Sequence, residues 1–298
     1  MLHLTESDVR PLLPMTEAIE RLRFAFESLA RGEAQSQPRR RLTLPSGSVL
    51  HSMAGACGKY FGTKYYSTNR KHGAYFFFTL FDAESAAPLA MMEANYLGQI
   101  RTGAATGYAA SLLANPKAAT LAIVGSGFQA RTQVEAIRAV CPIREVRTWS
   151  RDAEKCSRFA AEIGGEAAPT AQEAVRGADI VVTATNAKDP VIEADWVKRG
   201  SFVAAVGSNA ATRRELPAEL VRGAAIVVTD SMEQARIEAG DLILADCWSN
   251  AVELKDVRRS YRPEEIVIFK SVGIGLEDVA VAGWVYEKAV ERGVGRYS

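Results

Sequence analysis

Cysteine and histidine are scarce in this chain of 298 residues, which holds four cysteines and three histidines. No two cysteines form a Cys-x-x-Cys pair, and His3, His51 and His72 lie far apart in the sequence. Zinc sites and disulfide frameworks need such residues at short, fixed spacings. We therefore expect no bound metal, and we expect the four cysteines to be buried free thiols.

Long apolar runs and an excess of one charge are missing as well. Lys and Arg number 36 and Asp and Glu number 35, so the net charge of +1 favours neither nucleic acid nor another polyanion as partner. No apolar run approaches the roughly 20 residues of a membrane span, and residues 1–6 show no basic and then apolar signal. These absences predict a cytoplasmic protein that acts on a small molecule, and the length allows two domains.

A glycine-rich turn is the strongest positive signal. The apolar residues 119–124 lead into Gly125-Ser126-Gly127-Phe128-Gln129-Ala130, and apolar residues at helical spacing follow. This order of strand, Gly-x-Gly-x-x-Ala and helix is typical of a dinucleotide site, because the glycines let the backbone approach a pyrophosphate at the helix N-terminus. Strand and helix patterns alternate from there to about residue 269, which predicts a doubly wound parallel sheet.

The first third of the chain has a different pattern. A helix predicted over residues 16–32 is followed by β-type runs at residues 41–45, 49–53, 62–66, 74–81 and 88–92, which predict an antiparallel sheet. The run Tyr75-Phe76-Phe77-Phe78-Thr79-Leu80-Phe81 is apolar on both faces of a strand. Its second face is expected to pack against a partner subunit or, alternatively, against a helix of the same chain.

Two domains follow from these patterns. A helix at residues 97–113 ends at Asn115-Pro116, where we place the boundary. We predict an α+β domain at residues 1–115, completed by residues 276–298 with a final helix over about residues 276–292, and a Rossmann domain at residues 116–275. The expected fold class is α/β, with a doubly wound parallel sheet plus this discontinuous domain.

The choice between NADPH and NADH depends on the residues at the end of the second strand, about 20 residues past the glycines, because they contact the adenosine ribose. This strand ends Trp149-Ser150-Arg151, and a hydroxyl with a guanidinium suits the 2′-phosphate of NADPH, whereas an acidic residue there favours NADH. Asp152 follows at once and keeps NADH as the alternative. Because ligands bind outside the carboxyl ends of a parallel sheet, we expect cofactor contacts from Gly125, Ser126, Gly127, Phe128, Gln129, Ser150, Arg151, Thr185, Asn186, Val206, Gly207 and Ser271.

An ordered set of motifs resembles the ornithine cyclodeaminase/mu-crystallin family nearly from end to end. The motifs that carry the resemblance are Gln37-Pro38-Arg39-Arg40, Met53, Gly62-Thr63-Lys64, Arg101-Thr102-Gly103-Ala104-Ala105, the glycine turn, Val206-Gly207, Arg214-Glu215-Leu216, Ala239-Gly240-Asp241, Phe269-Lys270-Ser271-Val272-Gly273 and Glu277-Asp278. The resemblance implies an N-terminal substrate and dimerisation domain, a Rossmann domain, homodimers joined through the N-terminal sheets, and hydride transfer at the α-carbon of amino and imino acids.

The resemblance also implies roles for cationic side chains. Arg40 resembles the arginine that grips the substrate carboxylate, and the flanking Arg39 and Arg41 leave the register open by one residue. Lys64 resembles the active-site lysine, and Arg101 with Thr102 would lie between cofactor and substrate. Such cations hold a carboxylate so that its α-carbon is placed for hydride transfer. Without the family, the arginines also fit a solvated edge strand, Lys64 an exposed lysine, and Arg101 a cation paired with Glu93.

Two positions depart from the cyclodeaminases of the family. Those enzymes carry an aspartate where this chain has Asn209, which cannot act as a base, and a glutamate where it has His51, two residues before Met53. We therefore expect a reductase of a 2-imino acid, such as pyrroline-2-carboxylate, piperideine-2-carboxylate or iminosuccinate, with Arg39, Met53 and Asn209 near the substrate and His51 or Lys64 moving the proton. The alternatives are an amino-acid dehydrogenase, an ornithine cyclodeaminase, and a non-catalytic binder of NADPH and a small ligand.

Overall fold

The computed structural model describes all 298 residues. They form two compact units. Unit 1 consists of Met1–Arg101 and Gly273–Ser298, and unit 2 consists of Thr102–Val272. One sheet is mainly antiparallel and the other is parallel, so the expected fold class is confirmed. The division falls between Arg101 and Thr102, inside helix α3 (Asn95–Leu113), whereas the sequence places the boundary after that helix, at residue 115.

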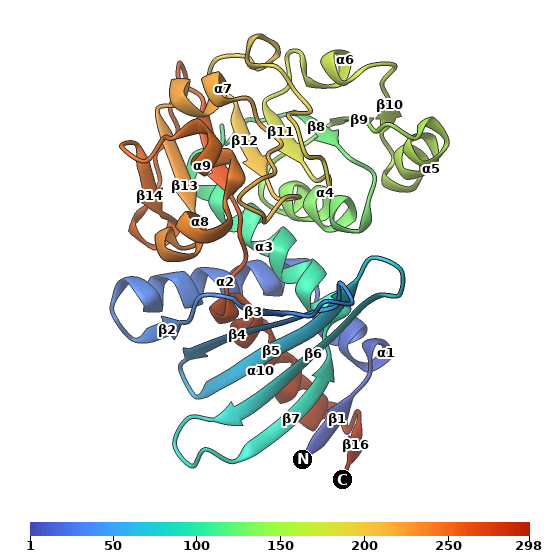
Figure 1. Ribbon diagram of the computed structural model, residues 1–298, viewed down its shortest axis with the longest axis vertical. Helices are drawn as coiled ribbons and strands as arrows, with labels where there is room; N and C mark the ends of the chain where they lie inside the picture. Colours follow the sequence, from blue (N-terminus) through green and yellow to red (C-terminus); the bar gives the residue numbers. More distant parts are fainter. The chain divides into compact units, whose positions relative to one another are not determined.

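Unit 1 is built on a sheet in the order β16-β1-β7-β6-β5-β4-β2, with β3 paired to β4 (Figure 1). Its strands are β1 (Leu2–Leu4), β2 (Ala34–Ser36), β3 (Arg40–Thr43), β4 (Val49–Cys57), β5 (Tyr60–Asn69), β6 (Gly73–Asp82), β7 (Pro88–Glu93) and β16 (Arg296–Tyr297). The strands predicted at residues 41–92 are present. The sequence patterns missed β1, β2 and β16, which are too short to show an alternation of apolar residues.

Helices cover one face of this sheet. They are α1 (Glu6–Val9), the 3₁₀ turn η1 (Arg10–Leu12), α2 (Met15–Ala30), the first part of α3, and α10 (Gly275–Arg292). Helix α10 packs across β4, β5 and β6 and alongside α2. Glycines allow this close approach, since a Cβ on Gly55 of β4 would lie 2.6 Å from the backbone nitrogen of Leu276. The N-terminus of α10 is therefore held directly against the middle of β4.

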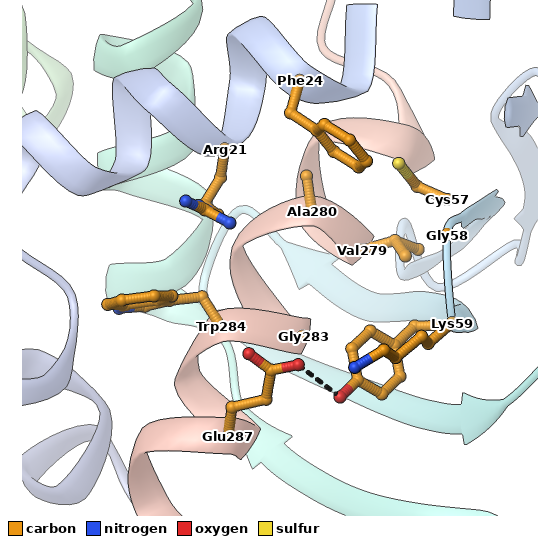
Figure 2. A pocket seen from close by; sticks show the side chains of 11 residues that line it. Arg21, Phe24, Cys57, Gly58, Lys59, Val279, Ala280, Gly283, Trp284 and Glu287 are labelled. Carbon is orange, nitrogen blue, oxygen red and sulfur yellow. Dashed lines mark hydrogen bonds between the residues drawn. The ribbon is translucent and has the colours of Figure 1, made fainter. Parts of the chain in front are cut away.

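Further along, α10 is fixed by contacts around a cavity of about 210 Å³ between α2, the turn at residues 57–60 and α10 (Figure 2). Arg21 of α2 lies over the ring of Trp284, 5.0 Å from its centroid. The Tyr60 hydroxyl donates to Glu287 Oε1 at 2.9 Å, and a Cβ on Gly283 would lie 2.5 Å from the Tyr60 ring. These contacts leave α10 little freedom to slide along the sheet.

The other face of the sheet carries half-buried aromatic side chains. Phe78 and Leu80 of β6 are fully buried in the core, whereas Phe77 and Phe81 point to the opposite face and are only partly covered. On that face Phe81 stacks with Phe61, and Phe77 with Tyr65, at centroid distances of 5.1 and 5.8 Å. The strand is thus apolar on both faces as expected, and its second face stays partly open within unit 1.

Unit 2 is a fully parallel sheet in the order β10-β9-β8-β11-β12-β15-β13-β14. Its strands are β8 (Thr120–Val124), β9 (Glu145–Trp149), β10 (Glu166–Ala167), β11 (Ile180–Thr183), β12 (Phe202–Ala205), β13 (Ile226–Thr229), β14 (Ala251–Glu253) and β15 (Val267–Lys270). All carboxyl ends share one edge, and β14 is the strand that the sequence patterns missed.

The helical segments of unit 2 connect these strands. They are the second part of α3, α4 (Phe128–Val140), α5 (Ala153–Ile163), α6 (Ala171–Val175), α7 (Ala218–Gly223), α8 (Met232–Glu238), α9 (Gly240–Ala245) and the 3₁₀ turns η2 (Ala194–Trp196) and η3 (Leu254–Asp256) (Figure 1). None of the helices in the chain combines the length and apolar character needed to cross a bilayer.

Candidate active site

The register of β4 and β5 brings predicted site residues onto one face of the unit 1 sheet. Met53 pairs with Lys64, and His51 pairs with Tyr66. Because side chains alternate along a strand, all four point to the face covered by α10. Met53 and Lys64 are each 3% exposed. Lys64 is therefore not the exposed surface lysine that the sequence alone also allowed.

Lys64 and Arg101 share one carboxylate supplied by α10. Lys64 Nζ donates to Asp278 Oδ1 at 3.0 Å, and Arg101 Nε donates to the same oxygen at 3.2 Å. Arg101 NH1 also donates to Glu277 Oε2 at 2.7 Å. The alternative pairing of Arg101 with Glu93 is wrong, because the acidic first turn of α10 supplies both of its carboxylate partners.

The buried side chains of unit 1 carry more positive than negative charge. The buried cations are Arg39, Lys64 and Arg101, and the buried carboxylates are Glu277 and Asp278. Burial lowers the pKa of Lys64 from 10.5 to about 8; Asp278 opposes this shift, and Arg101 adds to it. Because the buried charges of this cluster sum to a net positive charge, the cluster favours an added anion.

The structure places Arg39, not Arg40, among these cations. Arg39 is 6% exposed, and its NH2 group donates to the carbonyl oxygen of Gly273 at 3.1 Å. Arg40 and Arg41 instead begin β3, whose four side chains are all exposed. The sequence favours Arg40 but leaves the register open among Arg39, Arg40 and Arg41, and burial favours Arg39, because Arg40 and Arg41 lie on the exposed outer strand β3.

His51 is paired with Tyr66, which lies two residues after Lys64 in β5, so His51 and Lys64 are on the same face of the sheet. Its ring stacks on Tyr66 with the planes 3° apart and the centroids 4.2 Å apart, and Nε2 lies 3.1 Å from the Thr68 hydroxyl oxygen. The side chain is 9% exposed. The histidine that stands where the family's cyclodeaminases have a glutamate is therefore held in a defined orientation beside the cation cluster.

Unit 2 has a cleft of about 1100 Å³ at the carboxyl ends of β8, β9, β11 and β12. Gly125 follows β8 with a φ of +117°, and a Cβ on it would lie 2.5 Å from the carbonyl oxygen of Ala184. A Cβ on Gly127 would meet nothing within 4 Å, and α4 begins at the next residue. The first glycine is needed for the turn and the second leaves the backbone open, as the pyrophosphate of a dinucleotide requires.

Most residues predicted to contact the cofactor line this cleft. They are Gly125, Ser126, Gly127, Phe128, Gln129, Ser150, Arg151, Thr185, Asn186 and Gly207. Val206 and Ser271 are buried instead, and the Ser271 hydroxyl donates to Asp230 Oδ2 at 3.2 Å. Thr102 is buried in α3, and Arg101 belongs to unit 1. These four residues do not line the cleft.

Lys155 is a cleft residue that the sequence reasoning missed. Asp152 caps α5, accepting a hydrogen bond from the Lys155 backbone N–H at 3.0 Å, and its other oxygen pairs with Lys155 Nζ at 3.0 Å. The hydrogen bond from this backbone N–H holds the pKa of Asp152 below its usual value. Lys155 lies three residues after Asp152, the residue that caps α5, and this spacing is the signal in the sequence that could have identified it. Arg151, beside them, donates to Asn186 Oδ1 at 3.5 Å.

Asn209, which follows β12, is half-buried and donates its amide to the carbonyl oxygen of Val272 at 3.1 Å. This donor role fixes the amide, and an amide has no basic group. The site residues of the two units thus comprise a buried cationic cluster with a histidine in unit 1 and a cleft suited to a dinucleotide in unit 2.

Comparison with known proteins shows the family of this chain. Residues 1–293 match the model of the ornithine cyclodeaminase/mu-crystallin family. The chain is 34% identical over 313 residues to alanine dehydrogenase of Archaeoglobus fulgidus, covering 98% of this chain and 96% of that protein. It is 40% identical over 233 residues to Delta(1)-pyrroline-2-carboxylate reductase of Bacillus cereus, covering 72% and 71%.

A solved structure is similar over the full length. The Thermococcus litoralis Delta(1)-pyrroline-2-carboxylate reductase, determined in complex with NADH and L-proline, superposes with a TM-score of 0.94 at 30% identity, covering 100% of both chains. The family match spans almost the whole sequence, and the relatives are similar well beyond the level at which folds are shared by chance. This chain belongs to the ornithine cyclodeaminase/mu-crystallin family.

Proposed function

We propose that this protein is an NAD(P)H-dependent reductase that converts a 2-imino acid into the corresponding amino acid. The observation that carries the proposal is the buried charge of unit 1, three cations against two carboxylates. The carboxylate of an imino acid balances this excess. The dinucleotide cleft of unit 2 and the relatives named as pyrroline-2-carboxylate reductases support the same reaction.

The substrate carboxylate is assigned to Arg39 and Lys64. A guanidinium and an ammonium together fix a planar carboxylate, and such positioning can supply about 7–11 kcal/mol of a reaction barrier. Asp278 has a second role, because Oδ2 is buried and accepts no hydrogen bond within the protein. We assign this oxygen to the N–H that forms when the nitrogen of the substrate imine is protonated.

Proton transfer is assigned to Lys64, with His51 acting through water as the alternative. Reduction adds a hydride to the imine carbon and a proton to the nitrogen, so C=N becomes CH–NH. When bound, the nicotinamide supplies the hydride. A lysine with a pKa of about 8 is protonated at neutral pH yet releases its proton far more readily than an ordinary lysine.

NADPH is the proposed cofactor, with NADH as the alternative. Both carboxylate oxygens of Asp152 are engaged by Lys155, so this acid is poorly placed to accept a ribose hydroxyl. Arg151 and Lys155 add two cations to this part of the cleft. The 2′-phosphate of NADPH would be held by Ser150, Arg151 and Lys155.

The substrate class is a cyclic ketimine or an open-chain imine. Asn209 donates its amide and has no basic group, which disfavours ornithine cyclodeamination. With Arg39 and Lys64 on the first carboxylate, His51 suits a second one, as in iminosuccinate. We further propose a homodimer joined through the half-buried sheet face that carries Phe61, Phe77 and Phe81, since burying aromatic side chains is a main source of interface stability.

A panel of substrates tests the proposal. NADPH and NADH absorbance is followed with pyrroline-2-carboxylate, piperideine-2-carboxylate, iminosuccinate, and keto acids mixed with ammonia or methylamine. A reductase consumes the nucleotide with at least one of them. Release of ammonia from ornithine without net nucleotide use would identify a cyclodeaminase instead. Thermal stabilisation by NADPH with no turnover on any substrate would identify a non-catalytic binder.

A further inference from the structure

One buried glutamate ties together two loops at the carboxyl edge of the parallel sheet. Glu215 Oε1 accepts hydrogen bonds from the backbone N–H of Thr185 at 2.7 Å and from its hydroxyl at 2.8 Å. Glu215 Oε2 accepts one from the backbone N–H of Gly207 at 2.7 Å. Thr185 follows β11, Gly207 follows β12, and both line the nucleotide cleft. A single side chain therefore sets the spacing of two cleft-lining loops.

The three donors fit an ionised carboxylate at this position. Each of the two oxygens accepts at least one hydrogen bond from a backbone N–H. A proton on Oε2 would point at the N–H of Gly207, and two donors cannot form a hydrogen bond with each other. Burial raises the pKa of Glu215, and Lys270 opposes that rise. Gly207 has no room for a side chain, because a Cβ there would lie 2.7 Å from Glu215 Oε1 and closer still to the backbone of Thr185.

A second buried carboxylate holds Glu215 itself. Asp241 Oδ1 accepts hydrogen bonds from the backbone N–H groups of Glu215 and Leu216, at 2.7 and 2.9 Å. Its other oxygen pairs with Lys270 Nζ at 3.0 Å, and Lys270 also donates to the carbonyl oxygen of Ser208 at 2.6 Å. The side chains of Glu215, Asp241 and Lys270 are each 1% exposed or less. The backbone on both sides of the Glu215 contact is thus anchored by buried groups.

The position of these loops in the cleft indicates which part of a dinucleotide they serve. The glycine turn that suits the pyrophosphate follows β8, and the residues assigned to the adenosine ribose follow β9. β11 and β12 lie on the other side of β8 in the sheet. In a fold that binds a dinucleotide across the carboxyl edge, the nicotinamide half lies toward this side.

We propose that Glu215 is a positioning residue for the nicotinamide half of the cofactor. It acts through Gly207, whose backbone it holds in place at the nicotinamide side of the cleft. The proposal rests on the proposed function only in taking the ligand to be a nicotinamide dinucleotide. It is tested by binding rather than by turnover, so a wild-type protein that binds NADPH but reduces no imine would refute the reductase and leave this proposal intact.

The test compares each dinucleotide with the same molecule lacking nicotinamide. Dissociation constants are measured calorimetrically for NADPH against 2′-phospho-ADP-ribose and for NADH against ADP-ribose. In Glu215→Gln the amide oxygen still accepts from Thr185, but the amide nitrogen faces the N–H of Gly207. We expect the dissociation constant of the full dinucleotide to rise tenfold or more and that of the truncated one to rise less than threefold. An equal change for both ligands, or no change for either, would overturn the proposal.

Asp179→Asn is the matched control, because Asp179 also accepts two backbone N–H groups, those of Ala119 and Thr120, but at the opposite edge of the same sheet. Its thermal stability should fall while the ratio of the two dissociation constants stays at the wild-type value. A changed ratio in this variant would also overturn the proposal. If Glu215→Gln does not fold, Glu215→Asp decides by the same criterion, since the shorter carboxylate cannot keep its hydrogen bonds to both Thr185 and Gly207.

Discussion

Replacing Lys64 by methionine should make the protein more stable and far less active. Methionine has a similar length and no charge, so the core stays filled. In the folded protein the pKa of Lys64 falls from 10.5 to about 8, mainly through burial. At about 1.4 kcal/mol per pKa unit, this corresponds to about 3 kcal/mol lost by keeping the ammonium buried at neutral pH.

The gain from Lys64→Met should be smaller than that cost, because Asp278 loses one of its two donors while Arg101 still pairs with it at 3.2 Å. We expect the variant to be about 1 to 2 kcal/mol more stable than the wild type at pH 7, because Arg39 and Arg101 still balance the charges of Glu277 and Asp278. Below about pH 8 Lys64 is charged in both the folded and the unfolded chain, so the cost is fully present. Between pH 8 and 10.5 the folded protein releases the proton while the unfolded chain keeps it, so wild-type stability rises and the difference narrows.

Two measurements check this reasoning. Denaturant unfolding at pH 7, 9 and 10 gives the stability difference, and imine-dependent NADPH oxidation gives turnover, which should fall at least 100-fold. Lys59→Met is the control, because Lys59 is exposed in the turn before β5 and its loss should change stability by less than about 0.5 kcal/mol at every pH. A Lys64→Met protein that is less stable than the wild type at pH 7, or that keeps its activity, would refute the argument.

Three further predictions concern other residues. Arg39→Ala should raise the KM for the imino acid tenfold or more and Arg40→Ala less than threefold, because Arg39 is buried with the other cations and Arg40 is exposed. A larger effect of Arg40→Ala would assign the substrate carboxylate to Arg40. Arg151→Asp should move the kcat/KM preference from NADPH toward NADH, whereas an equal loss with both would contradict the 2′-phosphate assignment. Phe77→Lys should give monomers in sedimentation velocity with the fold retained, because Phe77 is half-buried on the open sheet face; a persistent dimer would place the interface elsewhere.

The local parts of the fold could be predicted well from the sequence. The turn at Gly125 needs a positive φ and a close approach to Ala184, and the glycine pattern announces both. The helix found as α10 (Gly275–Arg292) was predicted almost to its ends, since its apolar residues recur with helical spacing. Signals of this kind lie within a few residues of the structure that they specify.

Long-range pairings could not be predicted in this way. Three consecutive arginines look alike in the sequence, and Arg39 is distinguished only by a carbonyl group 234 residues away, that of Gly273. The shared carboxylate of Asp278 lies 214 residues from Lys64. The resemblance to the family pointed to these motifs, but the partner of each charged group depends on how α10 packs against the sheet.

Helix α10 belongs to unit 1 but follows unit 2 in the sequence, and this order has a consequence for synthesis on the ribosome. Lys64 and Arg101 are translated before the nucleotide-binding unit, and their carboxylate partners Glu277 and Asp278 come after it. At about 5–20 residues per second, the delay is on the order of 10 s or more. During that time the two carboxylates of α10 are not yet available to the two cations, so the cations stay hydrated. The nascent chain can therefore complete unit 2 first, and the buried charge cluster of unit 1 forms last.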